Sequence, residues 1–70
     1  MSQNGQQVVP NGRKWSVRRS GSSKATGTYE SRKEAIRKAD KIARNQETNL
    51  YIFGKDGRIE ERRSYNRDSA

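Results

Sequence analysis

Alternating apolar and polar positions in the first half of this chain predict strands. Lys14–Arg19 places Trp15 and Val17 between polar residues, which is typical of a strand with one buried face. Turn signals rich in Gly, Pro and Ser bound this run on both sides. Two weaker strand patterns lie beyond those turns, at residues 7–9 and 24–29.

One helix is predicted after these strands, and a capping box marks its start. The Ser31 hydroxyl can accept the Glu34 amide, and the Glu34 side chain can reach back. At about 100° per residue, the apolar residues fall within an arc of about 120° and form one stripe. The stripe consists of Ala35, Ile36, Ala39, Ile42 and Ala43. Glu34 with Lys38, and Asp40 with Arg44, are favourable pairs four residues apart. The helix is expected to end within 46–49.

The C-terminal part predicts a hairpin whose turn contains Asp and Gly. The strand Leu50–Phe53 alternates faces, so one pair of side chains can line a core while Tyr51 and Phe53 face away. A two-residue loop would put Ile59 on the core side. A three-residue loop with Gly57 as a bulge would instead put Ile59 beside the two aromatic rings. The sequence allows both.

These elements predict an α+β fold in the order β-β-β-α-β-β. One helix with a narrow apolar stripe can cover one face of a small, antiparallel-rich sheet. The expected core is the helix stripe together with Trp15, Val17, Leu50 and Ile52. The expected organisation is a flexible tail at 1–6, a single domain at 7–66 and a second tail at 67–70.

Composition excludes several classes of protein. The chain has no cysteine and no histidine, so disulfides, thiolate metal sites and histidine bases are absent. Glu60 and Glu61 are adjacent, and neighbours on a strand point to opposite faces. We therefore expect no catalysis, metal or cofactor. No apolar run approaches the roughly 20 residues of a membrane span, and the expected location is the cytoplasm of a bacterium or of a phage-infected cell.

The motifs of the chain resemble a family of small bacterial domains known as domain of unknown function 2188. The matching segments are Val8–Gly12, Trp15–Arg18, Glu34–Ile36, Leu50–Phe53, Gly54–Ile59 and Ser64–Tyr65. The similarity covers about 7–68. The family pattern continues from Ser-Tyr into Gly and a proline-rich end, from which this chain departs after Tyr65. The resemblance implies a small stand-alone domain and brings no agreed activity.

A strongly basic composition favours an anionic partner. Lys and Arg number 16 against 8 Asp and Glu, giving a net charge of +8, and such a balance indicates nucleic acid before other ligands. Aromatic residues ringed by arginines on a sheet form a stacking platform for unpaired bases. The expected DNA or RNA contacts are Arg18, Tyr51, Phe53 and Arg62 on the sheet, Arg58, Arg63 and Arg67 at the hairpin edge, and Lys33, Arg37, Lys41 and Arg44 along the helix.

A protein partner is the alternative for the same sheet face. Exposed aromatic side chains often meet a second copy or another protein, and an Ile59 on that face would strengthen this reading. The role would then be that of an interaction module, with a phage or stress-related process as one option. A third alternative is that Tyr29 or the N-terminal segment covers the patch and nothing binds there.

Overall fold

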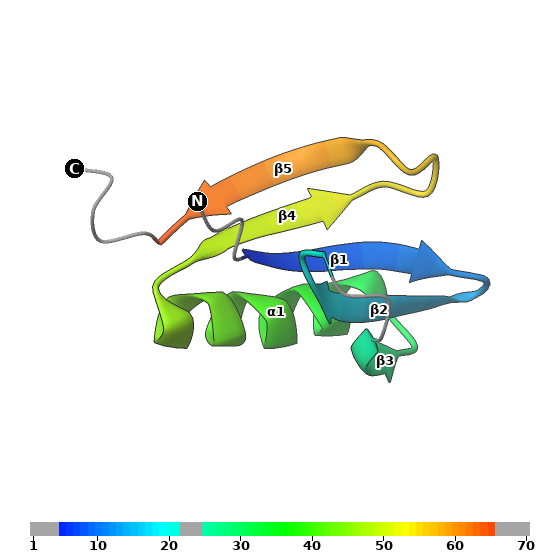
Figure 1. The fold of residues 1–70 in the computed structure, drawn as a ribbon. Helices are drawn as coiled ribbons and strands as arrows, with labels where there is room; N and C mark the ends of the chain where they lie inside the picture. Colours follow the sequence, from blue (N-terminus) through cyan, green and yellow to red (C-terminus); the bar gives the residue numbers. More distant parts are fainter. Residues whose placement is uncertain (1–4, 22–24, 66–70) are drawn as a thin grey trace.

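The computed structural model describes residues 5–21 and 25–65, which form a five-stranded sheet and one helix (Figure 1). The elements are β1 (Gly5–Asn11), β2 (Lys14–Arg19), β3 (Ala25–Tyr29), α1 (Arg32–Gln46), β4 (Asn49–Phe53) and β5 (Ile59–Ser64). Across the sheet the strand order is β3-β2-β1-β4-β5. Neighbouring strands run antiparallel except β1 and β4, which are parallel. The predicted α+β class and element order are confirmed.

The first strand is longer than the sequence pattern indicates. β1 begins at Gly5 rather than at residue 7, and Gln6 is buried within it. Gly5 and Gln6, which the sequence pattern assigned to a flexible tail, therefore belong to the sheet. Pairing with the neighbouring strands supplies hydrogen-bond partners for their backbone. The rest of the two predicted tails, 1–4 and 67–70, lies outside the described residues.

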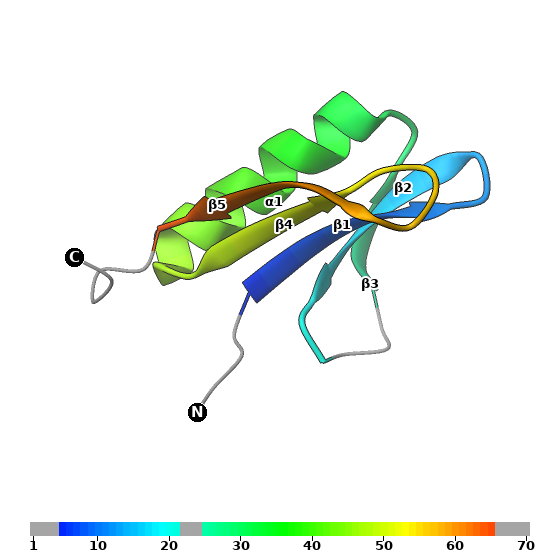
Figure 2. The ribbon, with the colours of Figure 1, turned by 90° about the horizontal axis from the view of Figure 1, so that it is seen from above.

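The core lies between the sheet and α1, as predicted. Figure 2 shows the helix along one side of the sheet. The fully or nearly fully buried apolar side chains are Val8, Trp15, Val17, Ala35, Ala39, Ala43, Leu50 and Ile52. Ile36 and Ile42 are half-buried at the two margins of the helix stripe. The central line of the stripe consists of alanines, whose short side chains let the helix lie close to the strands.

Local chemistry defines both ends of α1. The Ser31 hydroxyl accepts the Glu34 amide at 3.1 Å, which is the N-cap half of the expected capping box. The helix ends at Glu47, whose φ of 54° is left-handed and whose amide bonds Arg44 O. The Asp40–Arg44 ion pair forms at 3.2 Å. Among the described residues no ion pair joins Glu34 to Lys38.

The β4–β5 turn decides the orientation of Ile59. The Gly57 amide bonds Gly54 O at 3.0 Å, and the Gly54 amide bonds Arg58 O at 2.8 Å. Gly57 has a φ of 83°, so the loop has three residues with Gly57 as a bulge. Ile59 consequently pairs with Phe53 and shares its face. Of the two loops that the sequence allows, the structure has the longer.

A second irregularity corrects the expectation for the two adjacent glutamates. The pairing of β4 with β5 contains a β-bulge. Ile52 pairs with Glu61 and Phe53 pairs with Ile59, so Glu60 has no partner residue on β4. Glu60 accepts a hydrogen bond from Arg32 of α1, and Glu61 accepts one from Arg63. Because a bulge interrupts the alternation of a strand, both glutamates reach toward the helix side of the sheet, not toward opposite faces.

Candidate nucleic-acid interface

The sheet face turned away from α1, here called the open face, is covered by no other element of the described chain (Figure 2). Four of its side chains form a row across neighbouring strands. Gln7 of β1 pairs with Arg18 of β2 and with Tyr51 of β4, and Tyr51 pairs with Arg62 of β5. Since paired residues in a sheet share a face, two arginines flank an aromatic ring in a single line.

Tyr51 is fixed on this face by its neighbours. Asn49 Nδ2 donates a hydrogen bond to the Tyr51 hydroxyl at 3.2 Å. The ring lies against the backbone of Gly5, where a Cβ would come within 3.0 Å of Tyr51 Cε2. A larger residue at this position would displace the ring by a few tenths of an ångström. The ring is half-buried, so a partly exposed aromatic surface is held in one orientation.

Arg18 is also held in place by the row. Its Nε donates to Gln7 Oε1 at 3.0 Å, and its side chain is half-buried. The remaining guanidinium N–H groups have no protein acceptor within the described residues. An arginine oriented by one hydrogen bond can offer its other donors to a phosphate oxygen.

A polar network occupies the β2–β3 end of the open face. Asn11 Nδ2 donates to Ser16 Oγ at 3.0 Å, and Ser16 Oγ lies 3.3 Å from Thr28 Oγ1. Ser16 is buried, so this network satisfies its hydroxyl. The Ser16 hydroxyl is therefore already engaged in hydrogen bonds within the sheet.

The β4–β5 end of the open face is apolar. Phe53 is half-buried, and Ile59 beside it is 54% exposed. Among the described residues Ile59 is the large hydrophobic side chain with substantial exposure. An apolar patch therefore adjoins the row that contains Tyr51.

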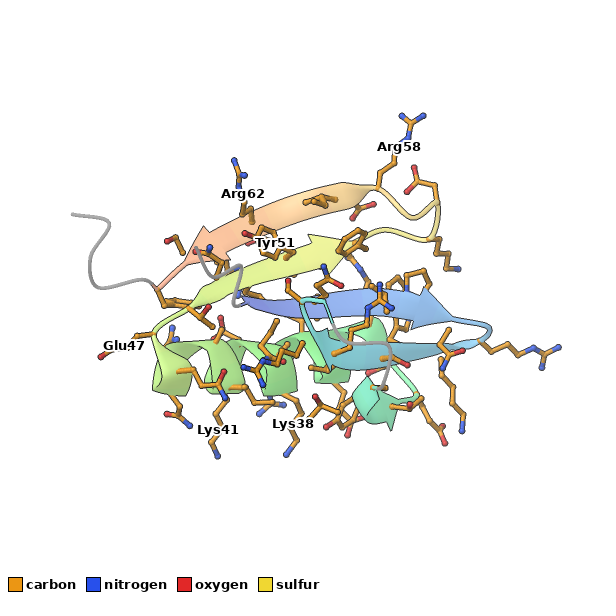
Figure 3. The ribbon with its side chains drawn as sticks, in the orientation of Figure 1. Lys38, Lys41, Glu47, Tyr51, Arg58 and Arg62 are labelled. Atoms are coloured by element: carbon orange, nitrogen blue, oxygen red, sulfur yellow. The ribbon has the colours of Figure 1, made fainter. Side chains whose placement is uncertain are left out.

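The hairpin contributes two exposed arginines. Arg58, in the turn just before β5, and Arg62, within β5, project away from the body of the sheet (Figure 3). The Arg58 side chain is 87% exposed, and its Nε lies 4.0 Å from Asp56. Asp56 also accepts the Arg58 amide and so belongs to the turn, as predicted. Arg62 makes no side-chain hydrogen bond or ion pair within the described chain, which leaves its guanidinium available.

Arg63 does not belong to this surface, which corrects the prediction for the hairpin edge. It reaches to the helix side, where it donates to Asp40 at 3.2 Å and to Glu61 at 2.6 Å. Tyr65 donates its hydroxyl to the same Asp40 oxygen. This hydrogen bond, with Arg63 and Arg44 nearby, holds the pKa of Asp40 below its ordinary value against an opposing effect of burial. Arg67 lies outside the described residues.

The predicted line of cations on α1 is only partly retained. Lys33, Arg37 and Lys41 are exposed and have no acidic partner in the described chain. Arg44 is engaged by Asp40 and lies 5.4 Å from the ring centre of Tyr65. Lys38 and Lys41 project from α1 in the direction opposite to Arg58 and Arg62 (Figure 3). The cations predicted from the sequence as one set of contacts therefore lie on two separate surfaces, one on α1 and one on the β4–β5 hairpin.

Two contacts that hold the site were not identified from the sequence. Gln7 and Asn49 orient Arg18 and Tyr51. Asn49 sits two residues before Tyr51, which is a same-face spacing that could have indicated the contact. Gln7 becomes a neighbour of Arg18 through the β1–β2 register, which the two-residue loop between Asn11 and Lys14 sets.

The structure also removes one candidate cover for the patch. Tyr29 packs against the buried core, on the side of α1, and not on the open face. Within the described ranges no group of three or more acidic residues could hold a metal ion. No helix in the same ranges is long and apolar enough to cross a membrane.

A comparison with protein-family models identifies the family of this chain. Neither the curated proteins nor the solved structures contain a match to this chain. A family model described as an uncharacterized protein conserved in bacteria (DUF2188) matches residues 6–65. That match runs from the second residue of β1 to the residue that follows β5 and includes Arg18, Tyr51 and Arg62 of the open face. The chain therefore belongs to the DUF2188 family of uncharacterized bacterial proteins.

Proposed function

We propose that this protein binds single-stranded nucleic acid on the open face, without catalysis. The row from Arg18 through Tyr51 to Arg62 is the observation that carries the proposal. An aromatic ring between two arginines can stack a base while the cations neutralise adjacent phosphates. The net charge of +8 favours the encounter with a polyanion.

The proposed contacts require little sequence specificity. Every base presents a flat face to Tyr51 or Phe53, and stacking does not depend on the pattern of donors and acceptors. Arg18, Arg58 and Arg62 would contact phosphates, which carry no sequence information. The protein would therefore bind unpaired DNA or RNA broadly and discriminate mainly against duplex, whose bases are already stacked.

Removing the aromatic rings tests the stacking component. Replacing Tyr51 and Phe53 with Leu keeps apolar side chains but removes the π faces. The affinity for a single-stranded oligonucleotide should fall by about 1–3 kcal/mol for each base that stacks. The measurement is fluorescence anisotropy with labelled single-stranded DNA, RNA and duplex DNA, together with amide chemical shifts to locate the contact.

The control for this experiment is Lys41→Leu, because Lys41 lies on the opposite side of the molecule. It should change the affinity far less than the loss of either ring. The fluorescence of the buried Trp15 reports whether each variant is folded. Unchanged affinity of a folded Tyr51→Leu, Phe53→Leu variant would rule out stacking on this face.

A second candidate is association of two copies through the same face. The exposure of Ile59 next to Phe53 favours it, since exposed apolar patches often mark protein contacts. The same titration separates the two candidates. Slow tumbling of a dimer, with no response to any oligonucleotide, would assign the open face to a second copy of the chain.

A further inference from the structure

A groove runs between α1 and β5 on the helix side of the sheet. In the described chain no Cα of β5 lies within 8 Å of a helix Cα, although the helix contacts all four other strands. Two ion pairs span the gap instead. Arg32 bonds Glu60 at 2.6 Å, and Arg63 bonds Asp40 at 3.2 Å. Because Arg32 and Asp40 are about two helical turns apart, these pairs bound a space between them.

This space has the size of a small-ligand site. Its volume is about 550 Å³, and it is lined by Arg32, Lys33, Ile36, Arg37, Asp40 and Arg63. Ligand pockets commonly have volumes of about 300–1,000 Å³. Ile36 is half-buried and supplies the apolar part of the lining. The other five lining side chains are charged.

Most of these charges are already neutralised by neighbours. Asp40 interacts with Arg63, Arg44 and Tyr65. Arg32 is paired with Glu60 and lies 5.5 Å from the ring centre of Trp15.

Two cations of the groove remain unneutralised. Lys33 and Arg37 are exposed and have no acidic partner among the residues that the structure describes. They are four residues apart on α1, a spacing that places two side chains next to each other. The charge at the groove that no neighbour neutralises is therefore positive and lies along its α1 edge.

We propose that this groove binds a small organic anion. A phosphate or carboxylate group would be held by Lys33 and Arg37, and an apolar body would lie against Ile36 between the two ion pairs. Arginine and lysine both donate charge-assisted hydrogen bonds to such oxygens. The groove is on the side of the sheet opposite to the open face, so this site is independent of the proposed nucleic-acid function.

Three small anions test the anion-binding part and the apolar part of the groove separately: phenyl phosphate, phenylacetate and inorganic phosphate. Chemical shifts of the Ile36 methyl groups and of the amides of Lys33 and Arg37 locate binding. Phenyl phosphate should bind about tenfold more tightly than inorganic phosphate, because its ring buries apolar surface. Phenylacetate shows whether a carboxylate replaces the phosphate. Failure of both aromatic anions to shift Ile36 at millimolar concentration would overturn the proposal.

A matched pair of double variants tests the role of the two cations. Lys33→Gln with Arg37→Gln should weaken phenyl phosphate binding by about tenfold, through loss of two charge-assisted contacts. The control, Lys38→Gln with Lys41→Gln, removes the same charge from the same helix outside the groove lining. It should change the affinity for phenyl phosphate less than twofold. Equal losses in the two variants would mean attraction by net charge alone and would overturn the site. The Tyr51→Leu, Phe53→Leu variant should bind phenyl phosphate normally, whether or not it binds nucleic acid.

Discussion

At the scale of single residues, Asp40 joins the helix to the C-terminal edge of the sheet. Tyr65 and Arg63 donate hydrogen bonds to Asp40 Oδ1, and Arg44 pairs with its other oxygen at 3.2 Å. The Tyr65 hydroxyl has the largest effect in lowering the Asp40 pKa, and the two arginines add to it. Since β5 has no close backbone contact with α1, this cluster attaches the end of β5 to the helix.

Replacing this carboxylate should destabilise the protein in a pH-dependent way. Asp40→Asn should lower the free energy of unfolding at pH 7 by about 1 kcal/mol, because charged acceptors give stronger hydrogen bonds than neutral ones. The folded pKa lies below the unfolded one, so the contribution of Asp40 is complete above the ordinary aspartate range. It is lost as the pH falls through the lowered pKa. Urea denaturation between pH 7 and pH 2 measures both effects.

Glu30→Gln is the control for Asp40, because Glu30 is exposed and has no ion pair within the described chain. Its stability should stay close to that of the original protein across the pH range. An Asp40→Asn variant as stable as the original at pH 7 would show that the cluster does not hold β5.

The sequence reveals only the local part of this cluster. Asp40 and Arg44 are four residues apart on a predicted helix, and that pair forms. The contacts with Arg63 and Tyr65 depend on how far β5 extends past the helix. Such a placement is fixed by the sheet as a whole, so no spacing in the sequence indicates it. Because the sequence does not show this placement, Arg63 was predicted to contact nucleic acid, whereas its side chain lies on the helix side and bonds Asp40.

At the scale of elements, the β4–β5 turn controls the chemistry of the open face. A loop one residue shorter would turn Ile59 toward the helix, since a one-residue slip moves side chains to the other face. The observed three-residue loop requires the left-handed conformation of Gly57, whose φ is 83°. The apolar patch beside Phe53 therefore depends on this glycine.

Substitutions at Gly57 should show this conformational requirement. Gly57→Ala should lower the free energy of unfolding by about 1 kcal/mol, because a Cβ disfavours positive φ. Gly57→Asn should cost less, since Asn tolerates that region better. Lys55→Ala, in the same exposed turn, should be close to neutral. Thermal denaturation ranks the three variants, and an Ala variant as stable as Lys55→Ala would refute the strain at this position.

The element pattern was largely predictable because several local signals agree. The Ser31 cap, the alanine-rich stripe and the alternation around Trp15 each specify one element and one buried face. Loop length was not predictable, because Asp56-Gly57 suits both hairpin geometries. Nor was the early start of β1, because Gly5 and Gln6 carry no strand pattern and become ordered only through their neighbours in the sheet.

At the scale of the whole molecule, ion pairs partition the positive charge. The acidic residues Asp40, Asp56, Glu60 and Glu61 each lie within 4.0 Å of an arginine. These pairs neutralise the hairpin turn and the helix side of β5. The cations without an acidic partner within the described chain include Arg18 and Arg62 on the open face and Lys33, Arg37 and Lys41 on α1. Net charge alone could not separate these two surfaces.

The dependence of nucleic-acid affinity on salt should identify which basic surface the strand contacts. Three phosphate contacts, by Arg18, Arg58 and Arg62, predict a slope of log K against log salt of about −2, at about −0.7 per phosphate for single strands. Arg62→Gln should reduce the magnitude of the slope by about 0.7, whereas Lys41→Gln, on the opposite side, should leave it unchanged. Fluorescence anisotropy from 50 to 300 mM salt, in about five steps, measures the slopes. A slope that responds to Lys41 and not to Arg62 would move the contact from the sheet to the helix.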